Sequence, residues 1–262
     1  MIGQYYQADS IIHRLDPRVK LLGTLLFVLS LFFPKNPENL ILSTAFLGLI
    51  IFLSKVPPGK MLKGIRPILF IILFSVAVNL FCTQGHEILN IGPLSVTSEG
   101  LWTAFYLAVR LIYLIIGSSV MTLTTTPKQL TDGMEQSLNF LKRMHVPVHE
   151  FSMMMSIALR FIPILSEELN KIKKAQMARG IDFETGGLIE RGKKLIPVLV
   201  PLFIAAVRRA SDLAFAMDAR CYHGGEGKTK LHPLRYERRD YVACGFLFLY
   251  MILMAAFAFL LF

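Results

Sequence analysis

The chain has 262 residues, of which 54% are hydrophobic and only 18% are charged. Soluble domains carry about 25% charged residues, and here the apolar residues come in blocks with a mean hydropathy of +0.54, so lipid must form part of the solvent. The net charge of +10 does not indicate nucleic-acid binding, because the basic residues flank apolar blocks, as at an anionic inner-leaflet surface or beside acidic partner proteins.

Five apolar blocks predict an all-α membrane protein with about five transmembrane helices. The first block, Val19–Phe33, follows Asp16-Pro17, a helix-start signal because Asp can cap the helix and Pro fits its first turn. This block is shorter than the roughly 20 residues that span a bilayer. The other four blocks are Leu40–Val56, Pro67–Cys82, Leu101–Leu123 and Tyr241–Phe262.

The distribution of basic residues predicts the orientation. The loop 83–100 has no Lys or Arg, whereas residues 127–240 hold 19 of the 28 basic residues. By the positive-inside rule, the N-terminus and residues 127–240 are cytoplasmic, and the loop 83–100 and the C-terminus lie outside. We therefore divide the chain into 1–126 with four transmembrane helices, 127–240 as a cytoplasmic region, and 241–262 with the last transmembrane helix.

The cytoplasmic region is predicted to form three long amphipathic helices, at about Pro127–Met144, Val148–Arg179 and Leu188–Arg220. On the second helix an apolar stripe recurs at steps of four and three and runs into Arg179; its members are Phe151, Met155, Ala158, Ile162, Leu165, Leu169 and Ile172. On the third helix a similar stripe runs into Arg220, through Leu199, Phe203, Ala206, Ala210, Leu213 and Met217.

Both stripes end in the same short motif, Ala-x-x-Ala-Arg followed by a small residue. Alanines three residues apart leave a shallow strip that a partner can approach closely, and the arginine can enter a groove and pair bidentately with a carboxylate. The duplication predicts two docking tips, Ala178-Arg179-Gly180 and Ala219-Arg220-Cys221, and hence two similar or identical partners. The alternative is that each arginine stabilises its own helix C-terminus, where positive charge is favourable.

Arg110 lies near the middle of the fourth apolar block. A charge in that position is unfavourable in lipid and is usually functional or paired. Arg110 is therefore a candidate functional residue. The alternative is a hydrogen bond inside the bundle, to a backbone carbonyl or to Asn79, with no role in transport.

The sequence resembles the transmembrane coupling subunit, or T component, of energy-coupling factor transporters for vitamins and metal ions. The resemblance covers nearly the whole chain and rests on HRLDPRVKLL, VPVHEFSMMMSIALRFIPILSEE, KAQMARGIDFETGG and AMDARCYHGGEGKTKL. The second tip reads Ala-Arg-Cys rather than Ala-Arg-Gly, and we expect little consequence because a small residue still follows the arginine.

The resemblance implies a bacterial cell-membrane protein that joins two cytoplasmic ABC-type ATPases to a small substrate-binding membrane subunit. Arg179 and Arg220 would each enter a groove on one ATPase and meet acidic residues. The chain itself would be non-catalytic and bind neither a cofactor nor a metal, with ATP and Mg in the ATPases. The adaptable side chains Met153, Met154 and Met155, with Phe161, are candidates for the interface with the substrate-binding subunit; ordinary interfacial packing is the alternative.

Two other classes of function fit the sequence less well. An intramembrane enzyme is disfavoured because no apolar block carries paired carboxylates, an HExxH motif or a Ser/Lys set. A self-sufficient secondary carrier is disfavoured because the blocks show no two-half repeat and almost no polar residues for a midplane site. The three cysteines show no paired spacing, so neither a disulfide nor a metal site is predicted.

Overall fold

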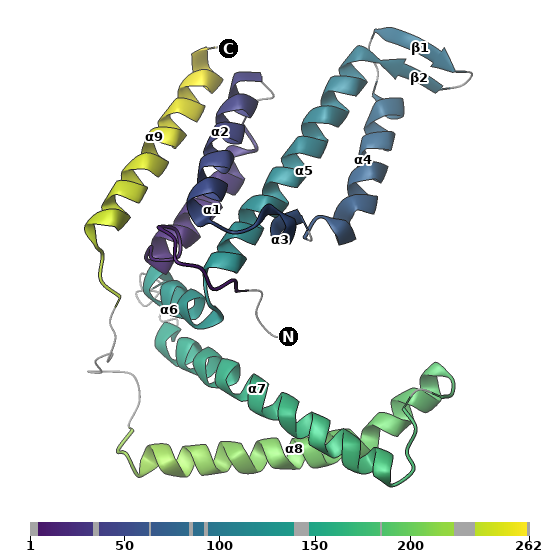
Figure 1. Ribbon diagram of the computed structural model, residues 1–262, viewed down its shortest axis with the longest axis vertical. Helices are drawn as coiled ribbons and strands as arrows, with labels where there is room; N and C mark the ends of the chain where they lie inside the picture. The colour runs from purple at the N-terminus through teal and green to yellow at the C-terminus, as the bar shows by residue number, and fades with distance from the viewer. Residues whose placement is uncertain are drawn as a thin grey trace. The chain divides into compact units, whose positions relative to one another are not determined.

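The computed structural model describes residues 5–33, 37–62, 64–83, 86–91, 94–138, 147–183, 185–222 and 234–260. They form two compact units. The first unit contains α1 (Pro17–Ser30), α2 (Pro37–Ser54), α3 (Pro58–Leu62), the 3-10 turn η1 (Arg66–Ile68), α4 (Leu69–Cys82), β1 (Glu87–Ile91), β2 (Leu94–Thr97), α5 (Ser98–Thr124), α6 (Pro127–Ser137) and α9 (Arg238–Leu260). The second unit contains α7 (Val148–Ala178) and α8 (Leu188–Asp218) (Figure 1).

The all-α fold class is confirmed, with one small addition. A two-stranded antiparallel hairpin, β1–β2, separates α4 from α5, with Ile91 paired to Leu94 (Figure 1). A local signal for this hairpin is present in the sequence, because two short segments of mixed apolar and polar residues flank Gly92-Pro93, and such a dipeptide marks a turn.

Five helical segments within the described residues are long and apolar enough to cross a membrane: α2, Pro58–Phe81, α5, α7 and α9. The number of candidate spans agrees with the prediction, but the helices are not the same ones, because α7 is among them and α1 is not. α1 has only 14 residues, fewer than the roughly 20 that span a bilayer, and packs against α5, α6 and α9; its crossing of the membrane, which the orientation proposed below requires, remains a prediction. α7 qualifies because its first half is almost uncharged, while its second half carries the Glu and Lys residues that indicated a cytoplasmic helix. Its cytoplasmic location remains a prediction.

The centre of the first unit is an apolar and aromatic cluster. Phe27 of α1, Leu47 of α2 and Tyr250 of α9 are buried in it, and the rings of Phe46 and Tyr250 stack with centroids 4.0 Å apart. α5 reaches this cluster at Gly117, where a Cβ atom would lie 2.7 Å from the Phe27 ring. Only glycine fits there without displacing that ring.

α6 belongs to the first unit, although the sequence grouped it with the cytoplasmic helices. It packs on α1, and a Cβ atom at Gly133 would lie 3.0 Å from Cβ of Pro17. Residues 139–144, the rest of the predicted helix Pro127–Met144, lie outside the described residues.

A buried carboxylate connects the start of α1 to the start of α9. Asp240 is only 2% exposed, and its two oxygens accept hydrogen bonds from the backbone N–H groups of Asp16 and Glu237, each at 2.8 Å. Asp16 caps α1 as predicted, accepting from the Arg18 N–H at 2.9 Å, and also pairs with the Arg18 guanidinium. Burial raises the pKa of Asp16, but the bonds from Arg18 outweigh it and hold the pKa below its ordinary value.

A second set of polar contacts fixes the segment that precedes α1. The amine of Lys20 donates to the carbonyls of His13 and Thr124, each at 3.0 Å. The His13 ring is bonded to the hydroxyl of Ser10 at 2.7 Å and to the carbonyl of Tyr6 at 2.9 Å. Burial lowers the pKa of His13, so the ring is held in its neutral form near neutral pH.

In the second unit, α7 and α8 cross (Figure 1). Both helices continue through internal prolines, Pro163 in α7 and Pro197 and Pro201 in α8. Since Pro201 has no N–H, the carbonyl of Pro197 lacks its normal helical donor. The buried side chain of Gln176 supplies it from α7, with Nε2 at 3.1 Å from that carbonyl. A helix defect in α8 is therefore compensated by a residue of the Ala-x-x-Ala-Arg motif in α7.

Candidate docking tips on α7 and α8

The C-terminus of α7 is closed by a Schellman motif. The Ile181 N–H donates to the Gln176 carbonyl at 3.1 Å, and the Gly180 N–H donates to the Met177 carbonyl at 3.0 Å. Gly180 has φ +89°, the left-handed conformation that this motif requires of the residue after the cap. The cap residue itself is Arg179.

The C-terminus of α8 has the same arrangement, 41 positions later in the chain. The Tyr222 N–H donates to the Met217 carbonyl at 3.1 Å, and the Cys221 N–H donates to the Asp218 carbonyl at 2.9 Å. Arg220 occupies the position that corresponds to Arg179, and Cys221 occupies that of Gly180. The sequence repeat thus corresponds to a repeat of backbone geometry.

The role expected of Cys221 needs correction. Cys221 has φ +56°, so this position requires a left-handed backbone, and a small side chain alone does not make a residue suitable for it. A residue with a Cβ atom is unfavourable in that conformation by about 1–2 kcal/mol. Cysteine therefore closes α8 less favourably than glycine would, although it follows the arginine as a small residue.

Replacing Cys221 with glycine should stabilise the end of α8 by about 1 kcal/mol, which slows amide hydrogen exchange at Tyr222 about fivefold. The reverse should hold for Gly180→Ala at the end of α7. Gly192→Ala serves as the control, because Gly192 lies within α8 with no atom near its missing Cβ and alanine should favour the helix there. Unchanged or faster exchange in Cys221→Gly would contradict this reading of the cap.

Both arginine side chains are exposed, and neither guanidinium has an ion pair or hydrogen bond to any residue that the structure describes. The last carbonyls of both helices are bonded by backbone N–H groups instead, so the caps do not require the guanidinium groups. The alanines of the two motifs, Ala175, Ala178, Ala216 and Ala219, are also exposed. Each tip is therefore a cation at the end of an open, shallow strip.

The two tips lie far apart. The Tyr222 hydroxyl, just beyond Arg220, donates to the sulfur of Met153 near the start of α7. At 1.5 Å per residue, Met153 and Arg179 are separated by roughly 40 Å along α7. In Figure 1 the C-terminal ends of α7 and α8 accordingly point in different directions from the crossing. One compact partner site could not hold both arginines.

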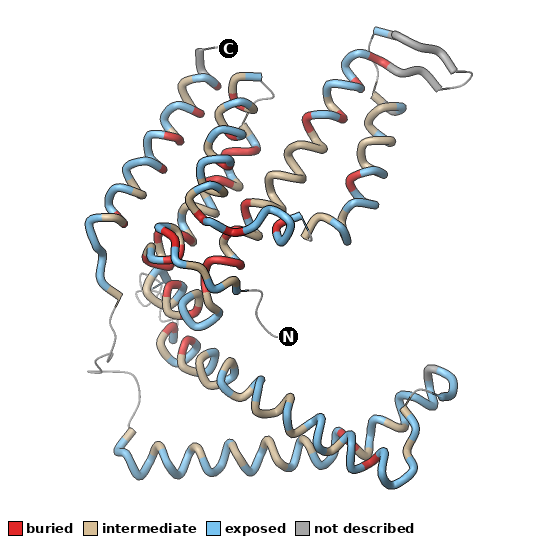
Figure 2. Tube along the Cα trace, viewed as in Figure 1, coloured by how far each residue is buried: buried red, intermediate tan, exposed pale blue. Residues whose placement is uncertain are grey.

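The apolar stripes are largely uncovered by the residues that the structure describes. Exposed apolar side chains on α7 include Phe151, Ile162 and Leu169, and on α8 Leu199, Phe203 and Val207. Figure 2 colours most of the α7 and α8 traces as exposed or intermediate. Soluble monomers rarely leave such a surface open. These faces are suited to cover by lipid or by partner chains.

The predicted methionine surface is only partly open. Met154 and Met155 are exposed, whereas Met153 and Phe161 are half-buried. Since the sulfur of Met153 accepts the Tyr222 hydroxyl, this methionine also helps to hold the end of α8. That intramolecular role was not predicted from the sequence.

Arg110 is positioned by aromatic rings. Its guanidinium carbon lies 5.2 Å from the Phe32 ring centroid and 5.1 Å from that of Tyr106, within the range of a cation–π contact. Asn79, the partner considered from the sequence, donates to Ser75 of its own helix. The Nε atom of Arg110 is buried without a hydrogen bond to any described residue.

Comparisons with known proteins agree with the resemblance. The family model CbiQ, described as cobalt transport protein, matches residues 8–231. Proteins named energy-coupling factor transporter transmembrane protein EcfT are 48% identical in Thermosediminibacter oceani, over 94% of both chains, and 46% identical in Bacillus subtilis, over 92% of this chain and 91% of that one. The chain belongs to the EcfT family, the transmembrane T components of energy-coupling factor transporters.

Proposed function

We propose that the chain is the non-catalytic coupling subunit of an importer, joining two cytoplasmic ABC-type ATPases to a small membrane subunit that binds a vitamin or a metal ion. The observation that carries this proposal is the duplicated helix end. Two exposed arginines, each after an alanine strip and each held by the same backbone motif, suit two copies of one kind of groove. ATP and Mg would be bound by the ATPases, and this chain would hold no cofactor.

The chemistry of the tips indicates what each groove contains. A guanidinium presents a planar fork of donors that matches a carboxylate. Because the backbone already closes each helix, the whole fork is available to a partner. Each groove should therefore contain acidic residues and be narrow enough to follow the alanine strip.

The substrate-binding subunit would be held by apolar contacts rather than by charge. The exposed stripes of α7 and α8 and the flexible side chains of Met154 and Met155 suit a surface that accepts more than one partner. The transported substrate would then be selected by that partner.

The orientation follows from the basic residues. The chain is a multi-pass membrane protein, and we infer that its N-terminus, α7 and α8 face the cytoplasm of a bacterial cell and its C-terminus the outside, because 19 of 28 basic residues lie in 127–240. This places both arginine tips on the side where ATP is available.

Mass spectrometry of the intact complex tests the proposal. A tagged chain extracted in mild detergent from its own cells should carry two ATPase chains and one small membrane protein, and ATP hydrolysis should occur in the complex but not in the chain alone. Uptake by the chain alone in liposomes would instead indicate a secondary carrier. ATP turnover by the chain alone would contradict the non-catalytic role.

A further inference from the structure

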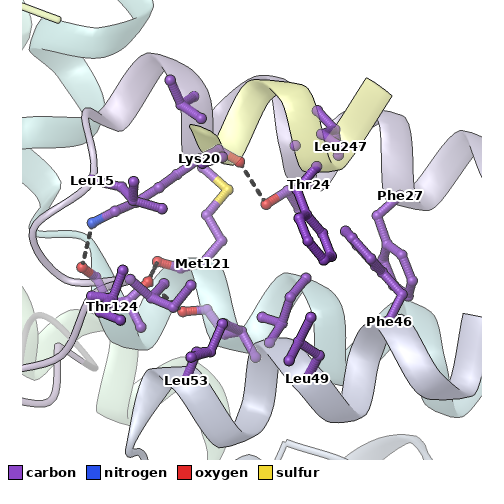
Figure 3. A pocket seen from close by; sticks show the side chains of 18 of the residues that line it. Leu15, Lys20, Thr24, Phe27, Phe46, Leu49, Leu53, Met121, Thr124 and Leu247 are labelled. Carbon is purple, nitrogen blue, oxygen red and sulfur yellow. Dashed lines mark hydrogen bonds between the residues drawn. The ribbon is translucent and has the colours of Figure 1, made fainter. Parts of the chain in front are cut away.

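The first unit contains a cavity of about 620 Å³ between α1, α2, α5 and α9 (Figure 3). α2, α5 and α9 contribute their halves nearest the start of α1, including Leu53, Met121 and Ala243, whereas α1 contributes residues from Val19 to Phe27 and the segment before it contributes Ile11, Ile12 and Leu15. On the orientation proposed above, this is the cytoplasmic half of the membrane. The volume lies within the roughly 300–1,000 Å³ of ligand-binding sites.

The lining is almost entirely apolar, and most of its few polar groups are already bonded. Lys20 donates to two backbone carbonyls, and the hydroxyls of Thr24 and Thr124 donate to carbonyls of their own helices, each at 2.8 Å. The exception is Arg239, whose Nε atom is buried without a hydrogen bond to any described residue. Its Nη2 atom pairs with Glu237 at 2.8 Å.

The cavity reaches the outer surface of the unit. The lining residues Leu49 of α2 and Val242 and Phe246 of α9 are 39%, 69% and 54% exposed. α2 and α9 are both of membrane-spanning length and composition, so the surface that carries these side chains faces lipid. An acyl chain can therefore enter from the bilayer without crossing water.

Charge distinguishes one end of the cavity from the other. Arg239 lies in the first turn of α9. Residues 234–240 contain three arginines and two carboxylates. The arginines are Arg235, Arg238 and Arg239. The opposite end, near Phe27 and Phe46, is apolar and aromatic. A cationic mouth that leads into an apolar interior matches a ligand with an anionic head and a hydrocarbon tail.

We propose that this cavity binds one acyl chain of an anionic phospholipid from the adjacent leaflet, with the lipid phosphate at Arg239. The unpaired Nε–H of Arg239 gains an acceptor, and the tail fills the space lined by α1, α2, α5 and α9. The lipid links α9, which follows α8 in the chain, to the N-terminal helices. This site is independent of ATPase docking, since none of its lining residues belongs to α7 or α8.

Native mass spectrometry of the delipidated full chain in detergent, titrated with dioleoyl phosphatidylglycerol or dioleoyl phosphatidylcholine, tests the proposal. The chain should retain one phosphatidylglycerol, bound about fivefold more tightly than phosphatidylcholine. Arg239→Gln should remove that preference, whereas Arg238→Gln should not, because the exposed Arg238 does not line the cavity.

Cavity-filling variants test the position of the tail. Ala243→Phe and Leu53→Phe should each abolish the retained lipid, whereas Gly245→Phe, on the exposed side of α9 with open space around it, should leave it bound. Equal retention of both lipids by the unmodified chain would overturn the proposal. So would retention by the two filled variants, or the same loss in Arg238→Gln as in Arg239→Gln.

Discussion

Replacing Arg179 and Arg220 together with glutamate should abolish association of the ATPases with this chain. Each substitution would bring a carboxylate into a groove that we expect to be acidic, and loss of one partner of a buried charge pair costs about 2–5 kcal/mol. Single variants should weaken assembly only partly, because the other tip still holds its ATPase. Co-purification of the ATPases and substrate uptake by cells would measure the effect.

The matched control is Lys174→Glu with Arg191→Glu, which makes the same change in charge on the same two helices. Both residues are exposed, and neither belongs to a tip motif, so assembly should persist. Arg179→Lys with Arg220→Lys should give an intermediate result, because an ammonium group cannot pair bidentately. Full uptake in the double glutamate variant would refute docking through the arginines.

Replacing Asp240 with alanine should lower the stability of the first unit by about 2–4 kcal/mol. The change leaves the backbone N–H groups of Asp16 and Glu237 without their acceptors, and the position is almost fully buried. Leaving a buried donor without an acceptor costs more free energy than a hydrogen bond contributes on net. The loss of stability should therefore exceed the net contribution of the two bonds. Thermal unfolding in detergent, at one fixed scan rate, would measure it.

Two further variants make that result specific to the carboxylate. Asp240→Asn retains one acceptor oxygen and should lose about half as much stability. Glu237→Ala, three residues earlier, removes only an exposed side chain with a surface ion pair and should change stability by less than about 1 kcal/mol. A similar unfolding temperature for Asp240→Ala and Glu237→Ala would contradict the role assigned to Asp240.

The long helices were largely predictable from the sequence. The expected limits of Val148–Arg179 and Leu188–Arg220 differ from α7 and α8 by one and two residues. Regular apolar stripes define such helices, and Pro147, Gly180 and Gly187 mark their ends locally. Whether the arginine tips dock onto ATPases remains a prediction.

Other features were not predictable, because their determinants are distant in sequence or have no local signature. The bond between the Asp16 N–H and Asp240 joins residues 224 positions apart, and no periodic pattern relates them. The left-handed backbone at Cys221 was missed because glycine, not cysteine, is its usual signal. The role of Gln176 has no local signal, because its acceptor is the Pro197 carbonyl that Pro201 leaves free on another helix.

The uncovered apolar faces of α7 and α8 have a consequence for the life of the protein in the cell. A newly made copy that meets no partner displays Phe151 and Phe203, the kind of surface that chaperones retain and quality-control proteases degrade. Cellular levels of the chain should therefore follow the supply of its partners, with surplus copies removed rather than stored.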